Sequence, residues 1–215
     1  MKKQLLWAAA VFLCFACKST DPALKYPNMV ENIDPFSLGT IEVFFDQIFS
    51  SPVKAGKVEV IFHPRENTVS LEFKYDLTRF RQFWDHSARQ IFIEALKQYN
   101  DDFTDKKLVA KYNKSRAIYG KVKSQIEWET AKFTTTYRAA PLLELGYRFK
   151  GENPYFTVRQ RSGRDKTMLS NEKNMESLPI SLYYTRAQGE KLAHLFNQDF
   201  LREMAIELKS SNTGE

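Results

Sequence analysis

The sequence predicts an α+β protein in which one antiparallel sheet of about six to seven strands is covered on one face by two long amphipathic helices. Three observations support this. Several short runs alternate apolar and polar residues, as half-buried strands do. Two longer segments repeat apolar residues every three to four positions, as amphipathic helices do. The composition suits a globular domain, since 43% of the 215 residues are hydrophobic and 27% are charged.

The clearest strands are residues 57–63 and 69–75, which alternate with period two and are separated by a short polar turn. This pattern predicts an antiparallel hairpin with one buried face. The preceding segment, 39–51, is strongly apolar, and we expect a short helix within it.

A long helix is expected next, capped by Asp76 or Thr78 and ending near Asn100. Its predicted apolar stripe combines positions at helical spacing: Phe80, Trp84, Ala88, Ile91, Ala95 and Tyr99.

The second half of the chain reads as a meander followed by one helix. Period-two alternation predicts a long strand over 118–128 and shorter strands near 133–137, 143–149, 156–158 and 178–184. Thr185 and Gln188 form the Thr-x-x-Gln pattern of a capping box, which predicts a helix start. An apolar stripe from Leu192 to Leu208 continues that helix.

The first residues predict export. Met1-Lys2-Lys3 is basic, and residues 5–16 contain no charge. A basic head, a short apolar stretch and a terminal small residue are typical of a secretory signal peptide. The apolar stretch is too short to cross a bilayer, which takes about 20 residues.

Cys17 directly follows Ala16 at the end of this stretch, and the segment resembles a bacterial lipoprotein precursor. In that class a lipobox, usually Leu-Ala/Ser-Gly/Ala-Cys, is cut before its cysteine. Here Ala16 and Cys17 match, whereas Cys14 and Phe15 depart from the usual pattern. The resemblance implies cleavage between Ala16 and Cys17 and acylation of the Cys17 thiol with chains such as palmitate. The alternative is an ordinary signal peptide cut at Ala16 or a few residues later.

These features predict four segments: a signal peptide (1–16), a lipidated N-terminus with a flexible tether (17–38), a single α+β domain (39–209) and a disordered tail (210–215). Removing residues 1–16 deletes two lysines and no acid, so the net charge falls from +6 to +4. Both cysteines lie within the first 17 residues, so we expect no disulfide in the domain.

No catalytic, cofactor-binding or metal-binding motif is recognisable, and we expect no cofactor. His63 and His86 are interpreted as surface residues. His194 lies four residues after Glu190, a spacing that suits a surface pair or, alternatively, an oriented base.

Two basic clusters could contact anionic lipid headgroups or acidic envelope polymers, and the alternative is a solvated, mildly positive surface. Their residues are Lys106, Lys107, Lys111, Arg159, Arg161, Arg164 and Lys166. Nucleic acid is not expected as a partner of an exported protein.

The function expected from the sequence is a non-enzymatic binding or accessory role in the cell envelope, on the periplasmic or the surface face of a membrane. One alternative is a carrier or sensor of a hydrophobic ligand held between sheet and helix. Another is a hydrolase whose active site carries no recognisable motif.

Overall fold

The computed structural model describes residues 28–46, 54–112, 117–130, 136–164 and 176–212. The strands are β1 (Phe36–Phe45), β2 (Lys54–His63), β3 (Thr68–Tyr75), β4 (Thr78–Trp84), β5 (Ile118–Lys123), β6 (Ile126–Thr130), β7 (Thr136–Ala139), β8 (Leu142–Lys150), β9 (Asn153–Gln160) and β10 (Ile180–Tyr184). The helices are α2 (His86–Thr104), α3 (Arg186–Phe196) and α4 (Gln198–Asn212), with a 3₁₀ turn η1 (Ala110–Tyr112).

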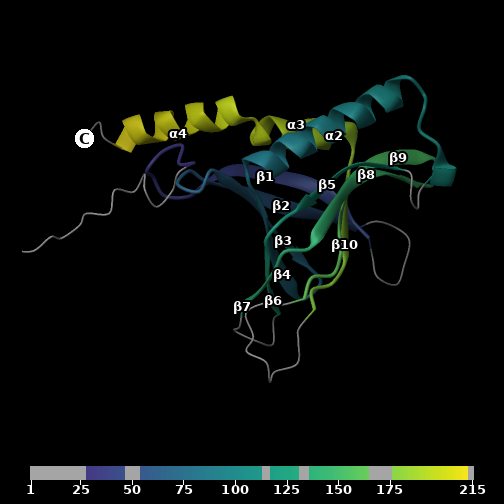
Figure 1. The fold of residues 1–215 in the computed structure, drawn as a ribbon, viewed down its shortest axis with the longest axis horizontal. Helices are drawn as coiled ribbons and strands as arrows, with labels where there is room; N and C mark the ends of the chain where they lie inside the picture. The colour runs from purple at the N-terminus through teal and green to yellow at the C-terminus, as the bar shows by residue number, and fades with distance from the viewer. Residues whose placement is uncertain (1–27, 47–53, 113–116, 131–135, 165–175, 213–215) are drawn as a thin grey trace, which may run out of the picture.

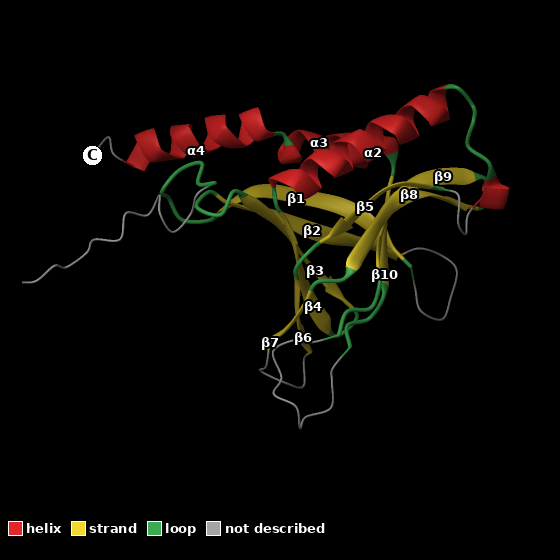
Figure 2. Ribbon diagram, in the orientation of Figure 1, coloured by secondary structure: helices red, strands yellow, loops and turns green. Residues whose placement is uncertain are grey.

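The fold class predicted from the sequence is wrong in its proportions. The described chain is mostly β, and its ten strands form one antiparallel sheet curled into a half-barrel, not a sheet of six to seven strands. The strand order is β5-β8-β9-β10-β1-β2-β3-β4-β6-β7. The described residues form three α-helices where two were predicted: α2 and α3 lie over the curled sheet, and α4 extends past it (Figures 1 and 2).

A bent two-stranded ribbon brings the two ends of the sheet together. Only Ser124 and Gln125 separate β5 from β6, and only Ala140 and Pro141 separate β7 from β8. β5 pairs with β8 at one end of the strand order, and β6 pairs with β7 at the other. The four strands are therefore two long strands that bend at the same place, which we call the corner. Because β6 bonds to β4 and β8 to β9, the sheet has to curl.

The curl makes distant strands face each other across a packed interior. Gln82 on β4 donates from Nε2 to Oε1 of Gln160 on β9 at 2.8 Å, although four strands lie between them in the sheet order. In the same interior, Phe92 of α2 inserts among aromatic rings at centroid distances of 5.1 to 6.3 Å, in edge-on geometries. The partners of Phe92 are Trp84, Phe156, Tyr184 and Phe196.

The long helix expected from residue 78 begins later, because residues 78–84 form β4. Thr78, Phe80, Gln82 and Trp84 alternate toward the buried face, so this segment has period two. Phe80 and Trp84 are four residues apart, a spacing that both periods satisfy. The true helix cap is Asp85, whose Oδ1 accepts from the Ala88 N–H at 2.7 Å.

Three other predicted boundaries shift. The single C-terminal helix is two helices, since Asn197 ends α3 and its Oδ1 accepts from the N–H groups of Asp199 and Phe200 to start α4. The predicted strand over 118–128 is broken at the corner into β5 and β6. The short helix expected within 39–51 is wrong for residues 39–45, which belong to β1; residues 47–53 lie outside the described chain. The Thr185 capping box is confirmed.

A buried arginine joins the helices to the sheet. Arg89 of α2 is 0% exposed, and its guanidinium donates five hydrogen bonds of 2.6 to 3.2 Å to uncharged oxygens. The acceptors are the carbonyls of Phe196, Asn67 and Trp84 and the side chains of Asn67 and Gln198. Burial lowers the pKa of Arg89 to about 10, so it stays charged at neutral pH.

Replacing this residue tests its role. We expect Arg89→Met to lower the free energy of unfolding by about 3 kcal/mol, because several buried acceptors lose their donor. Arg79→Met is the matched control, since Arg79 is exposed on β4 and should change stability by no more than about 0.5 kcal/mol. Urea unfolding of the full chain measures both values. Equal, small losses would show that Arg89 does not hold the helices in place.

Candidate binding pocket

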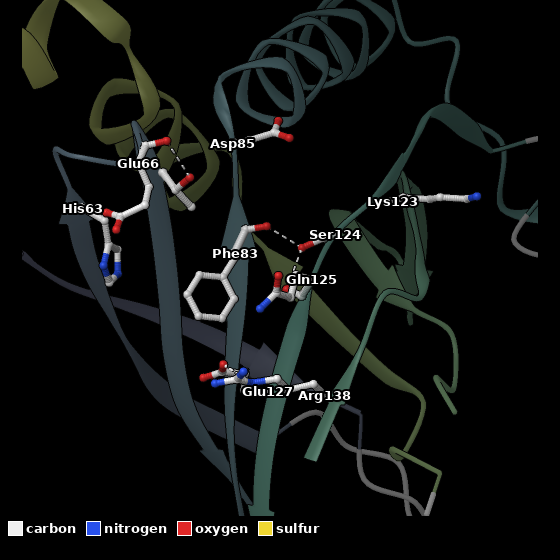
Figure 3. Close-up of a pocket in the computed structure, with 10 residues that line it drawn as sticks. His63, Glu66, Phe83, Asp85, Lys123, Ser124, Gln125, Glu127 and Arg138 are labelled. Atoms are coloured by element: carbon white, nitrogen blue, oxygen red, sulfur yellow. Dashed lines mark hydrogen bonds and ion pairs between the residues drawn. The ribbon is translucent and has the colours of Figure 1, made fainter. Parts of the chain in front are cut away.

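The corner of the bent ribbon borders an open pocket of about 400 Å³ (Figure 3). We call it the corner pocket. Residues from the end of β2, the β2–β3 turn, the start of β3, the end of β4, the end of β5, the corner itself, β6 and β7 line it. They are His63, Glu66, Thr68, Phe83, Asp85, Lys123, Ser124, Gln125, Glu127 and Arg138.

The pocket forms where two neighbouring chain segments separate. The Phe83 N–H donates to the Gln125 carbonyl at 2.9 Å, and the Ser124 hydroxyl donates to the Phe83 carbonyl at 2.5 Å. Beyond this point the two segments diverge. β4 ends and the chain enters α2 after Asp85, whereas β6, followed backward along the chain, leads through the corner into β5 at Lys123. The same bend that closes the sheet therefore opens the pocket.

His63 forms one wall of the pocket in a half-buried position. Its Nε2 lies 2.9 Å from the hydroxyl of Ser70, and its ring centroid lies 6.0 Å from that of Phe83. Burial lowers the pKa of His63, and the nearby carboxylate of Glu66 opposes this effect without reversing it. Ser70 is 0% exposed, so this Ser–His pair cannot present its hydroxyl to a substrate.

A ladder of alternating charge crosses the outer face of the sheet beside the pocket. Glu72 on β3, Arg81 on β4, Glu127 on β6 and Arg138 on β7 occupy directly paired positions. Arg81 bonds to Glu72 at 2.6 Å and to Glu127 at 3.0 Å, and Arg138 bonds to Glu127 at 2.9 Å. Two acids and two cations thus compensate one another.

The charges in the pocket leave a negative excess. The lining contains three carboxylates, those of Glu66, Asp85 and Glu127, against the two cations Lys123 and Arg138. Figure 3 shows the Lys123 side chain extending away from the Phe83 ring and the Arg138 guanidinium reaching toward Glu127. No group of three side chains that could hold a metal ion occurs in the described part of the chain.

The residues expected to contact anions lie elsewhere, in two places. Lys106, Lys107 and Lys111 are exposed in the connection from α2 through η1, and Lys107 bonds to Asp105 at 2.7 Å. Arg159 and Arg161 flank the buried Glu144 at 3.8 and 2.5 Å.

Arg164, the next residue of the second cluster, bonds to Glu176 at 3.3 Å. Acids therefore compensate much of the charge that the second cluster carries. Lys166, Ala16 and Cys17 lie outside the described residues.

The three histidines lie in different surroundings. His86 is exposed, as expected, whereas His63 faces the corner pocket. His194 packs against Phe200 at 4.4 Å between ring centroids, while Glu190 accepts from Asn100 at 3.3 Å. The sequence held no signal for the corner pocket, because its lining comes from separate segments that only the curl of the sheet brings together.

Residues 35–203 match a protein family described as "Uncharacterised Treponema protein". The chain belongs to this family. The matched segment runs from just before β1 into α4 and includes every residue of the corner pocket.

One curated relative is an uncharacterized protein of Treponema pallidum (strain Nichols), which is 20% identical over 159 residues. The alignment covers 74% of this chain and 55% of the relative, so the chain spans about half the length of the curated relative that it matches. No solved structure matches the chain. Among the helices of the described residues, none is both long enough and apolar enough to cross a bilayer.

The buried position of His63 predicts a pH-dependent stability. Because its folded-state pKa is lowered, the unfolded chain binds the proton more readily, and stability falls as pH drops below about 6.5. We expect the wild-type chain to lose more stability than His63→Gln between pH 7.5 and pH 5.5 in urea unfolding. The control His86→Gln should follow the wild type. A wild-type pH profile that matches His63→Gln would contradict the burial argument.

Proposed function

We propose that the protein is an exported lipoprotein, anchored in a cell-envelope membrane through Cys17, with a non-enzymatic role in which the corner pocket binds a ligand. The observation that carries the binding role is the open, charged pocket of about 400 Å³ at the corner of the sheet. Pockets of this size suit small molecules or single side chains.

The hydroxyl chemistry at the pocket favours binding over catalysis. The Ser124 hydroxyl donates to the Phe83 carbonyl, and the Ser70 hydroxyl is buried behind His63. Both groups already serve the fold, whereas the carboxylates of Glu66 and Asp85 belong to exposed residues. The pocket therefore offers exposed carboxylates to a ligand, while these two hydroxyls stay bonded within the fold.

The interior gives less support to the alternative of a hydrophobic carrier. The rings that could line an apolar cavity contact one another instead: Phe92 touches Trp84, Phe156 and Phe196, and all four are 0% exposed. We therefore place the ligand on the outer face, in the corner pocket.

The proposed anchor rests on the position of Cys17 directly after Ala16, at the end of the apolar stretch. Each buried CH₂ of an acyl chain contributes about 0.8 kcal/mol, so two or more chains hold a protein firmly at a membrane.

Substitution of Cys17 tests the anchor. We expect Cys17→Ala to abolish acylation and to release the protein from the membrane fraction, as measured by fractionation and intact mass. Cys14→Ala is the matched control, because it removes the other thiol and should leave acylation intact. A Cys17→Ala protein that stays in the membrane fraction and still carries the mass of the acyl chains would refute the anchor.

The binding role has a separate test. Native mass spectrometry of the protein purified from its own membranes should show a bound small molecule. Gln125→Trp should abolish this adduct by filling the corner pocket, whereas Gln90→Trp, at an exposed position on α2, should retain it. The absence of an adduct from the wild type, or its persistence in Gln125→Trp, would refute ligand binding in the corner pocket.

A further inference from the structure

We propose that the corner pocket binds an alkylammonium group, held between the Glu66 carboxylate and the Phe83 ring. This inference rests on the proposed binding role and adds the chemical class of the ligand. The ammonium could belong to a free diamine or to the lysine side chain of a peptide, since both present the same group on an unbranched chain.

The charge of the pocket is opposite in sign to that of the chain. The chain carries a net charge of +6, yet the pocket lining has three carboxylates and two cations. One carboxylate, Glu127, is compensated by Arg81 and Arg138. Glu66 and Asp85 remain as exposed acids against Lys123, whose side chain extends away from the Phe83 ring, so a ligand cation would meet a net negative rim.

The walls near Phe83 carry hydrogen-bond acceptors, whereas the Lys123 side chain extends away from that ring and Arg138 reaches toward Glu127. The Gln125 side chain supplies an amide oxygen. If Nε2 of His63 donates to Ser70, the other ring nitrogen carries a lone pair and can accept. An ammonium has three donors and no acceptor, so it matches such a lining better than a carboxylate or phosphate would.

Phe83 contributes a half-buried aromatic ring to the pocket wall. The Arg81 guanidinium carbon lies 5.9 Å from its centroid, so the ring already attracts a cation. Arg81 donates to both Glu72 and Glu127, and these acids offset the repulsion that its charge would exert on a second cation. The methylene groups of the ligand would pack on the same ring.

The test uses the detergent-solubilised full chain and isothermal titration calorimetry with putrescine. We expect saturable binding at one site with a Kd below about 1 mM. Glu66→Gln should weaken binding about tenfold, because it removes a charge-assisted hydrogen bond while keeping the shape of the side chain. Glu94→Gln removes one exposed acid from α2, outside the pocket, and should bind as the wild type does.

Two further ligands separate charge from shape. The neutral 1,4-butanediol and the anionic succinate have similar chain lengths and should not bind. Phe83→Leu should weaken putrescine binding while circular dichroism shows an unchanged fold, because the variant keeps an apolar side chain but loses the ring. Equal weakening in Glu66→Gln and Glu94→Gln would show a diffuse charge effect and would overturn the proposal.

The same titration with Nα-acetyl-lysine amide identifies the source of the ammonium. Binding of this compound supports a lysine side chain, whereas binding of putrescine alone supports a free diamine. If neither binds, the alkylammonium proposal is wrong. A pocket adduct in native mass spectrometry that contains no amine would also overturn it, while leaving the proposed binding role in place.

Discussion

The rest of the structure depends on one shared bend. It lies at the corner, where β5 continues into β6 and β7 continues into β8. Each strand leaves one end of the sheet and joins the other within two residues, so the sheet cannot be flat. Pro141 suits this position because the ladder of strand hydrogen bonds is interrupted at the bend. A proline, which has no N–H to donate, leaves no donor unpaired there. The Ser124 N–H donates to its carbonyl across the bend. The curl encloses the aromatic interior, and the strands that separate at the bend form the corner pocket.

The helices depend on a second arrangement, the guanidinium of Arg89. A charged group is costly to bury, and here five uncharged oxygens from different segments surround it. Asn67, in the turn between β2 and β3, has a φ of 49° and contributes two of these oxygens. A hydrophobic residue at position 89 could fill the same buried space under α2. It would have no donors, however, to fix the β2–β3 turn, α2 and the start of α4 relative to one another.

The sequence indicated most strands and the start of α3, because alternation and capping are local. The hairpin of β2 and β3 and the cap at Thr185 are examples. It failed at 78–84, where apolar residues four apart fit a strand and a helix equally, and at the corner, where alternation continues through a bend. The corner pocket was beyond reach, since His63, Phe83 and Gln125 meet only after the sheet has curled.

The N-terminal end of the described chain bonds to Pro64, the residue that follows His63 of the corner pocket. Val30 donates its N–H to the carbonyl of Pro64, and Glu31 pairs with Lys209 of α4 at 2.8 Å. Pro64 stands between the pocket residue His63 and the turn that carries Glu66. If Cys17 carries lipids, as proposed, Asn28 follows it by eleven residues, and a chain of that length spans at most ~40 Å. Such an anchor would keep the pocket close to the bilayer surface, where the effective concentration of a membrane-bound ligand is high.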